Sequence, residues 1–195
     1  MMQELINHYD KLILGIDKNI KGLKIYPEIL NEERNHKFHF ILNKILHNSL
    51  VVSDILLGLK YLDLSNVLNN GIERAYFARI VALNSYEILI NSGRLTGNKD
   101  VKEILKQIND NEIDEELKQL KIKIQALKDE ERYLKEIRTN IIAHKDENPF
   151  TQIQVFQDLD PKRIFITGNS IFNLHLELNN FFLKILNEIP NLDKT

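Results

Sequence analysis

Apolar side chains recur three and four positions apart along most of the chain, with polar residues between them. This spacing places the apolar positions on one side of an α-helix, so it predicts amphipathic helices that pack on one another. The four prolines and most of the glycines fall in or beside the breaks between these segments, where they interrupt helical structure. We expect helices over residues 3–24, 32–61, 65–91, 99–108, 114–144 and 171–189.

Two apolar stretches indicate their own place in the fold. AYFARIVALNSYEILI, within 65–91, is apolar around most of a helical circumference, so we expect that helix at the centre of the bundle. Gly93 and Gly97 then end it. SLVVSDILLGL contains Asp54 and is shorter than a membrane span, so it predicts a buried helix.

One region departs from the helical pattern. Within 145–168, the stretches TQIQVF and RIFIT alternate apolar and polar residues around QDLDPK, which predicts a small, irregular β-hairpin. Ser170 is then the expected N-cap of the last helix, which stops at Pro190. The prediction is therefore one domain over residues 1–195. Its fold class is all-α: an up-and-down helical bundle of five or six helices, with a small β-hairpin before the last helix.

Composition places the chain among ordinary globular proteins. Charged residues make up 28% and hydrophobic residues 43%, and the formal net charge is −2. Such a chain has no overall field that attracts phosphates, so contact with RNA would need a local cluster of Lys and Arg. The absence of cysteine excludes disulfides and thiolate metal sites, and it fits a reducing compartment. The N-terminal segment lacks the pattern of a signal peptide, so we expect a cytoplasmic protein with no membrane partner.

The segment RTNIIAH, near the end of the fifth predicted helix, carries the candidate chemistry. On a helical wheel Leu134, Ile137 and Ile141 form one apolar stripe. Arg138 falls about 60° to one side of Ile141, and His144 falls about 60° to the other. The two polar residues are about 9 Å apart along the axis, so one helix places them poorly for a shared ligand. A second copy packed about a two-fold axis would bring both pairs to one cleft.

The longer segment YLKEIRTNIIAHKDEN resembles the signature of the HEPN superfamily, in which an Arg and a His lie a few residues apart near the end of a bundle helix. Five residues separate Arg138 from His144 here. The order of helices, the stretch IERAYFARIVALNSYEILI, the AHKD at the helix end and the ending RIFIT…SIFNLHLELNNFF are similar to the abortive-infection branch of that superfamily. The resemblance covers the chain from about Phe38, and its one specific element is the Arg–His motif.

This resemblance implies a homodimer whose paired motifs form a metal-independent RNA-cleaving site in defence or a toxin-like stress response. It implies no cofactor and no metal, and the implied partners are RNA and an antitoxin or other protein. Attack by a 2′-hydroxyl needs proton transfer and positive charge near the phosphorane-like transition state. We expect His144 to transfer protons, Arg138 to hold the phosphate and Asn140 to orient the imidazole or the phosphate.

A non-catalytic interpretation of the motif stays open. Thr139 follows the Arg directly, at the place where many active members of the superfamily have Asn, Asp or His. The alternative is a helical dimer that binds a nucleotide, an RNA or a protein partner without cleaving it. Arg138 would then pair with a carboxylate such as Glu131 or one on a neighbouring helix, and His144 would cap the helix C-terminus.

Two further patterns have simpler interpretations. In EERNHKFH, Glu33 and His36 have the Glu-x-x-His spacing of di-iron bundles, with His39 one turn on. A di-metal site needs two such motifs and two further glutamates, so a solvated or partly buried helix face is favoured. The lysines of KQLKIKIQALKDEERYLKEIR indicate a solvated face, with guidance of RNA toward the motif as the alternative.

Overall fold

The computed structural model describes residues 2–23, 36–67, 71–143 and 159–192. These residues form seven helices and no strand, so the prediction of an all-α bundle is confirmed. The helices are α1 (Met2–Leu23), α3 (His36–Val67), α4 (Gly71–Gly97), α5 (Lys99–Ile108), α6 (Asn111–Ala126), α7 (Lys128–Ala143) and α9 (Pro161–Leu192).

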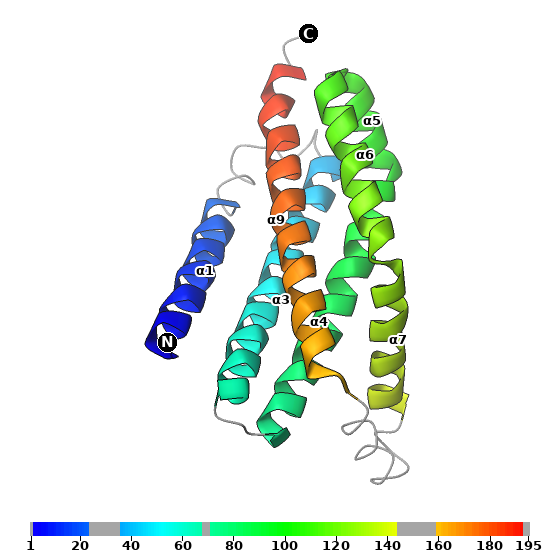
Figure 1. Ribbon diagram of the computed structural model, residues 1–195. Helices are drawn as coiled ribbons and strands as arrows, with labels where there is room; N and C mark the ends of the chain where they lie inside the picture. The colour runs from blue at the N-terminus through cyan, green and yellow to red at the C-terminus, as the bar shows by residue number, and fades with distance from the viewer. Residues whose placement is uncertain (1, 24–35, 68–70, 144–158, 193–195) are drawn as a thin grey trace.

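The long helices α3, α4 and α9 form the body of the bundle (Figure 1). Helix α4 packs against α3, α9, α7, α6 and α5, which confirms the prediction that it lies at the centre. Helix α1 lies along α3, while α6 and α7 follow one another along the opposite side of the bundle (Figure 1). The largest fully buried side chains come mainly from α3, α4 and α9, among them Ile41, Leu56, Leu59, Ile88, Phe181 and Phe182.

Two glycines allow the three central helices to approach closely. A Cβ atom on Gly58 of α3 would lie 2.6 Å from one γ-methyl of Val81 on α4. A Cβ atom on Gly168 of α9 would lie 2.6 Å from the other γ-methyl of Val81 and 3.1 Å from a methyl of Leu59. Because real side-chain carbons do not approach so closely, only glycine fits at these positions without a shift of the neighbouring helices.

The predicted β-hairpin is not supported where the structure describes it. Residues of the RIFIT stretch belong to the first turns of α9, which begins at Pro161. Asp160 starts this helix, because its Oδ1 accepts a hydrogen bond from the Arg163 amide (3.0 Å) and its carbonyl accepts one from the Ile164 amide (3.0 Å). Ser170 lies inside the helix and donates to the Ile166 carbonyl, so its prediction as an N-cap is wrong. The TQIQVF stretch lies outside the described residues.

Other predicted helix ends also differ from the structure. Helix α5 has the predicted bounds, and it is capped by Asn98, whose side chain accepts from the Asp100 amide. Helix α4 continues through Gly93 to Gly97, and α9 continues through Pro190 to Leu192. The helix predicted over 114–144 is two helices, because the backbone tightens at Leu127, whose amide donates to the Ile124 carbonyl.

One stretch of the described residues, Phe40–Asn66 within α3, has the length and hydropathy of a membrane span. Half of its most apolar window is buried inside the bundle. Val52, Ile55, Leu56 and Leu59 are each at most 1% exposed, so the prediction of a buried helix for this part of the chain is confirmed. A central helix of a packed bundle meets the same length and hydropathy criteria, so this stretch is weak evidence for a membrane span.

Candidate functional site

The motif helix α7 is fixed by a buried stripe on one side. Leu134 and Ile137 are 1% and 6% exposed, and α7 packs against α4. These two residues therefore lie on a core-facing stripe, as the helical wheel predicts. Arg138 and Thr139 are exposed beside it. Since Leu134 and Ile137 are buried within one chain, this part of the stripe is not available for packing against a second copy.

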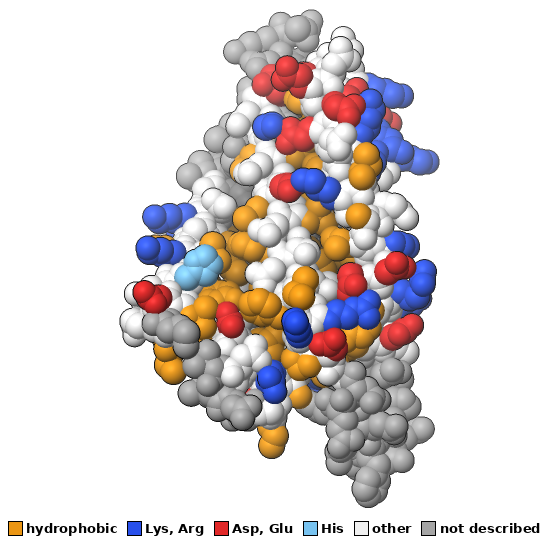
Figure 2. All heavy atoms as spheres, in the orientation of Figure 1, with side chains coloured by type: hydrophobic (Ala, Val, Ile, Leu, Met, Phe, Trp, Pro, Cys, Tyr) orange, Lys and Arg blue, Asp and Glu red, His pale blue; other side chains and the backbone are white. Residues whose placement is uncertain are grey.

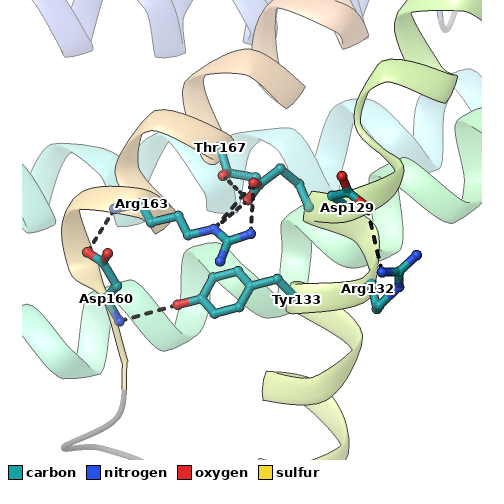
Figure 3. A network of polar contacts seen from close by, with 7 residues as sticks. Asp129, Arg132, Tyr133, Asp160, Arg163 and Thr167 are labelled. Carbon is teal, nitrogen blue, oxygen red and sulfur yellow. Dashed lines mark hydrogen bonds and ion pairs between the residues drawn. The ribbon is translucent and has the colours of Figure 1, made fainter.

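The first turns of α7 are held to the start of α9 by an Arg–carboxylate pair (Figure 3). Arg163 donates from Nε and Nη2 to the Glu130 carboxylate at 2.9–3.3 Å, and Thr167 donates to the same carboxylate at 2.8 Å. The hydrogen bonds from Arg163 lower the pKa of Glu130 below its usual value, because they stabilise the charged form. This network fixes α7 relative to α9.

The ring of Tyr133 lies below the Arg163 guanidinium, whose carbon is 3.9 Å from the ring centroid (Figure 3). The Tyr133 hydroxyl accepts a hydrogen bond from the Asp160 amide at 3.3 Å. Burial raises the pKa of Tyr133 above its usual value, so the ring is a neutral packing group at neutral pH. Arg163 thus lies between an aromatic face and a carboxylate and holds the N-terminal part of the motif helix in place.

Arg138 lies on the other flank of α7, against the central helix. Its guanidinium carbon is 5.2 Å from the centroid of the Tyr86 ring on α4, within the range of a cation–π contact. The residue also lines a surface pocket of about 470 Å³ between α4 and α7. The pocket is lined by Leu83, Asn84, Tyr86, Glu87, Ile90, Asn91, Arg94 and Arg138.

The charges in this pocket favour an anion. Glu87 is the one acidic residue among the described residues that line it, and a 2.7 Å hydrogen bond joins this carboxylate to His47 Nε2 on α3. Among the described residues, neither Arg94 nor Arg138 has a carboxylate partner. The lining includes two arginines and two asparagines, Asn84 and Asn91, residue types whose planar donors suit a phosphate. The pocket is therefore suited to bind a phosphate group.

The structure describes the side chains of some of the predicted site residues and not of others. Arg138 is placed at the pocket, and Thr139 is exposed beside it. Asn140 lies in α7, but its side chain is outside the described residues, as is the side chain of Ile141. His144 is outside them entirely. Glu131, the suggested partner of Arg138, is 2.8 Å from Lys128 instead.

The bundle interior holds a second polar cluster, around His175 of α9. His175 is 1% exposed, and its Nε2 is 2.9 Å from Asn179 Nδ2 and 3.5 Å from Ser49 Oγ. Burial lowers the pKa of His175 to about 4, because the low-dielectric interior disfavours the imidazolium. The cluster is closed to solvent and neutral at pH 7, so we assign it to packing of α9 against α3.

The structure does not test the di-iron interpretation of EERNHKFH directly, because the residues that it depends on are largely outside the described part of the chain. Glu33 is outside the described residues, and so are the side chains of His36 and His39. Within the described part of the chain, no three His, Asp or Glu side chains are grouped as metal ligands would be.

Of the residues that line the pocket, only Arg138 was predicted from the sequence, and the missed ones include Tyr86 and Arg94. Tyr86 lies in an apolar stretch that indicates burial rather than a site, and Arg94 follows Gly93, where the sequence predicts that the helix ends. A detectable signal was present, because Asn84, Glu87, Asn91 and Arg94 recur at three- and four-residue spacing and so share one side of an otherwise apolar helix. Comparison of the chain with protein-family models, with curated proteins and with solved structures gave no significant match.

Proposed function

We propose that the chain is a HEPN-type, metal-independent endoribonuclease acting in defence or a toxin-like stress response in the cytoplasm. The observation that supports this most is the position of Arg138. Its guanidinium is exposed at a pocket, lies on Tyr86 and has no carboxylate partner among the described residues. An arginine that served only structure would be expected to pair with a carboxylate, as Arg163 does with Glu130.

In the proposed reaction, the 2′-oxygen of a ribose attacks the adjacent phosphorus and the bond to the 5′-oxygen of the next nucleotide breaks. One histidine accepts the proton from the 2′-hydroxyl, and a second, protonated histidine donates a proton to the leaving 5′-oxygen. Arg138 stabilises the additional negative charge on the phosphorane oxygens. Asn140 is assigned the orientation of His144 or of the phosphate. The products are a 2′,3′-cyclic phosphate and a 5′-hydroxyl.

One chain has one His144, so the proposed mechanism requires a homodimer that brings two motifs to one cleft. The buried Leu134 and Ile137 cannot form that contact. We propose instead that the two-fold axis passes near the exposed flank of α7 that carries Arg138 and Thr139. In this arrangement an antitoxin or other protein would inhibit the enzyme by covering the same cleft.

The same pocket supports a second candidate, a non-catalytic dimer that binds a nucleotide or an RNA. Two guanidinium groups beside an aromatic ring hold a phosphate whether or not a bond is broken. Thr139 in the position after the Arg favours this candidate. Thr139→Asn is predicted to raise cleavage if this departure weakens the site.

RNA cleavage in EDTA by purified protein distinguishes the two candidates. We expect the parent to cleave, His144→Ala to abolish cleavage, and Arg138→Ala to slow it on the order of 10²- to 10³-fold. Arg132→Ala is the matched control, because Arg132 is an exposed arginine of the same helix whose partner is Asp129. The rate should peak at one pH and fall on either side, since the paired histidines act in opposite protonation states. A dimer that cleaves no RNA, or a His144→Ala variant as active as the parent, would favour the binding protein.

A further inference from the structure

A second pocket lies next to the Arg138 pocket along the same helix. This neighbouring pocket, of about 520 Å³, lies between the C-terminal part of α4 and the helices α6 and α7. Ile90 and Arg94 line both pockets, so the two pockets are neighbours along α4, and we call them together the α4 groove. The groove follows α4 from Leu83 to Gly97, about 21 Å at the rise of an α-helix.

The free charges in the α4 groove are basic. The described residues that line it include four with cationic side chains, Arg94, Lys121, Lys128 and Arg138. The two acidic residues among them already have partners, since Glu87 is bonded to His47 and Glu131 to Lys128. Among the described residues, Arg94, Lys121 and Arg138 have no acidic partner. Three cations from three different helices therefore line one groove in a chain whose net charge is −2.

A third pocket is bordered by paired charges instead of free cations. It lies between α6 and α9, has a volume of about 570 Å³, and is bordered by two ion pairs, Lys123–Glu177 (2.6 Å) and Lys184–Glu116 (2.5 Å). On this face of the bundle, basic and acidic side chains lie next to each other, with apolar side chains between them (Figure 2). Neutralised charges of this kind hold helices together and attract a polyanion weakly.

This comparison separates the lysines of α6 by role. Lys118 pairs with Glu115 and Lys123 with Glu177, whereas Lys121 faces the α4 groove. The lysines of α6 look alike in the sequence, but those on one side of the helix pair with acidic residues, while Lys121 on the other side has no acidic partner among the described residues. Leu89, Ile90 and Ile124 line the same pocket as Arg94 and Lys121, and they offer apolar surface on which a base can rest.

We propose that the α4 groove binds single-stranded RNA, with Arg94 and Lys121 holding phosphates on the side of the Arg138 pocket away from the C-terminal end of α7. The strand would then run along α4 into the site where Arg138 holds the reacting phosphate. That the bound strand is RNA rests on the proposed ribonuclease function. That Arg94 and Lys121 hold its phosphates rests on the charges of the groove.

The test is binding of a short 2′-O-methyl oligoribonucleotide, which lacks the attacking hydroxyl, measured by fluorescence anisotropy over a salt series. We expect Arg94→Gln with Lys121→Gln to weaken binding about 10-fold or more. The slope of log affinity against log salt should fall by about 0.7 for each phosphate that the variant no longer neutralises. The matched control combines Arg132→Gln with Lys118→Gln, which removes the same charges outside both pockets and should change affinity less than about 2-fold.

Binding and cleavage separate the two proposals. If the parent binds through Arg94 and Lys121 but cleaves no RNA, the groove stands and the ribonuclease function fails. If the parent cleaves RNA while the groove variant keeps parental affinity and KM, the groove proposal is overturned and the ribonuclease function stands. Absence of binding by the parent, or an equal decrease of affinity in the groove and control variants, also overturns the groove proposal.

Discussion

The guanidinium carbon of Arg138 lies 5.2 Å from the centre of the Tyr86 ring. This contact joins the motif helix α7 to the central helix α4, and it gives the exposed arginine a defined direction. A long cationic side chain loses conformational entropy when it binds a phosphate, and a ring that already restrains it reduces that loss. Tyr86 is therefore expected to position the phosphate-holding group without touching the substrate.

Replacement of Tyr86 tests this positioning role. Tyr86→Leu should lower kcat/KM for RNA cleavage about 2- to 5-fold, because a cation–π contact at an exposed site is worth about 0.5–1 kcal/mol and its removal frees the arginine. Tyr86→Phe keeps the ring and should retain parental activity. Equal activity of the Leu and Phe variants would show that the ring does not position Arg138.

Helix packing at Val81 gives a prediction on stability. Gly168→Ala should lower the free energy of unfolding by about 1–3 kcal/mol, because the new methyl group overlaps a γ-methyl of Val81. Val81→Ala removes that methyl, so the double variant should recover part of the loss, with a coupling energy on the order of 1 kcal/mol. Urea denaturation of the parent, the two single variants and the double variant measures this coupling energy.

Gly15 of α1 is the control for this substitution, because a Cβ placed on it would meet no atom of the other described helices within 4 Å. Gly15→Ala should raise stability by about 0.5–1 kcal/mol, the usual gain in helix propensity. A Gly168→Ala variant as stable as Gly15→Ala would contradict the close approach of α4 and α9.

The Arg163–Glu130 pair predicts a pH-dependent contribution to stability. The pKa of Glu130 is lowered below 4.5 in the folded protein, so the unfolded chain takes up the proton first as the pH falls. The contribution is complete above pH 4.5 and is lost as the pH drops through the lower folded pKa. Glu130→Gln should cost about 1–2 kcal/mol at pH 7, reduced for partial exposure of the pair.

Denaturation of the parent and Glu130→Gln at several pH values checks this, and the two stabilities should converge in acid. Asp129→Asn, at an exposed position beside Glu130, should have little effect. A parent–variant difference that stays constant down to the lowest pH at which the protein folds would show that the carboxylate charge does not hold α7 to α9.

His175 predicts a second loss of folding stability in acid, caused by a basic group rather than a carboxylate. Its pKa is about 4 in the folded protein and 6.5 in a solvated chain, so between these values only the unfolded state binds the proton. Stability should fall as the pH drops from 6.5 toward 4, by up to about 3 kcal/mol. His175→Leu should flatten this part of the stability curve, and an unchanged slope would show that His175 is not buried in neutral form.

Helical periodicity was enough to predict the fold class, the central place of α4 and the bounds of α5. It failed at 161–168, where the buried residues Ile164, Thr167 and Gly168, followed by Ile171, have helical spacing of three and four residues. Over so short a stretch, this spacing is easily mistaken for the alternation of a strand. The Asp160–Pro161 pair was the deciding signal, because Asp is a good N-cap and Pro is favoured in the first turn. The break at Leu127 has no such signal, since apolar spacing continues across it.

The site residue on α7 could be predicted from the sequence, whereas those on α4 could not. The wheel placed Arg138 beside the stripe of Leu134 and Ile137, since one helix fixes those directions. Its contact with Tyr86 and its shared pocket with Arg94 depend on how two helices pack, which no local pattern encodes. The sequence also could not show that Lys123 of α6 has an acidic partner, because that partner, Glu177, lies on α9.

The chemistry at the cut ends tests the proposed function most directly. RNA incubated with the purified protein in EDTA should yield 2′,3′-cyclic phosphate and 5′-hydroxyl ends, as attack by the 2′-oxygen requires. A 2′-O-methyl copy of the same RNA should stay intact, and both kinds of end should vanish with His144→Ala. Cleavage of the 2′-O-methyl strand, 3′-hydroxyl ends with 5′-phosphates, or activity lost in EDTA would contradict a mechanism built on Arg138 and His144.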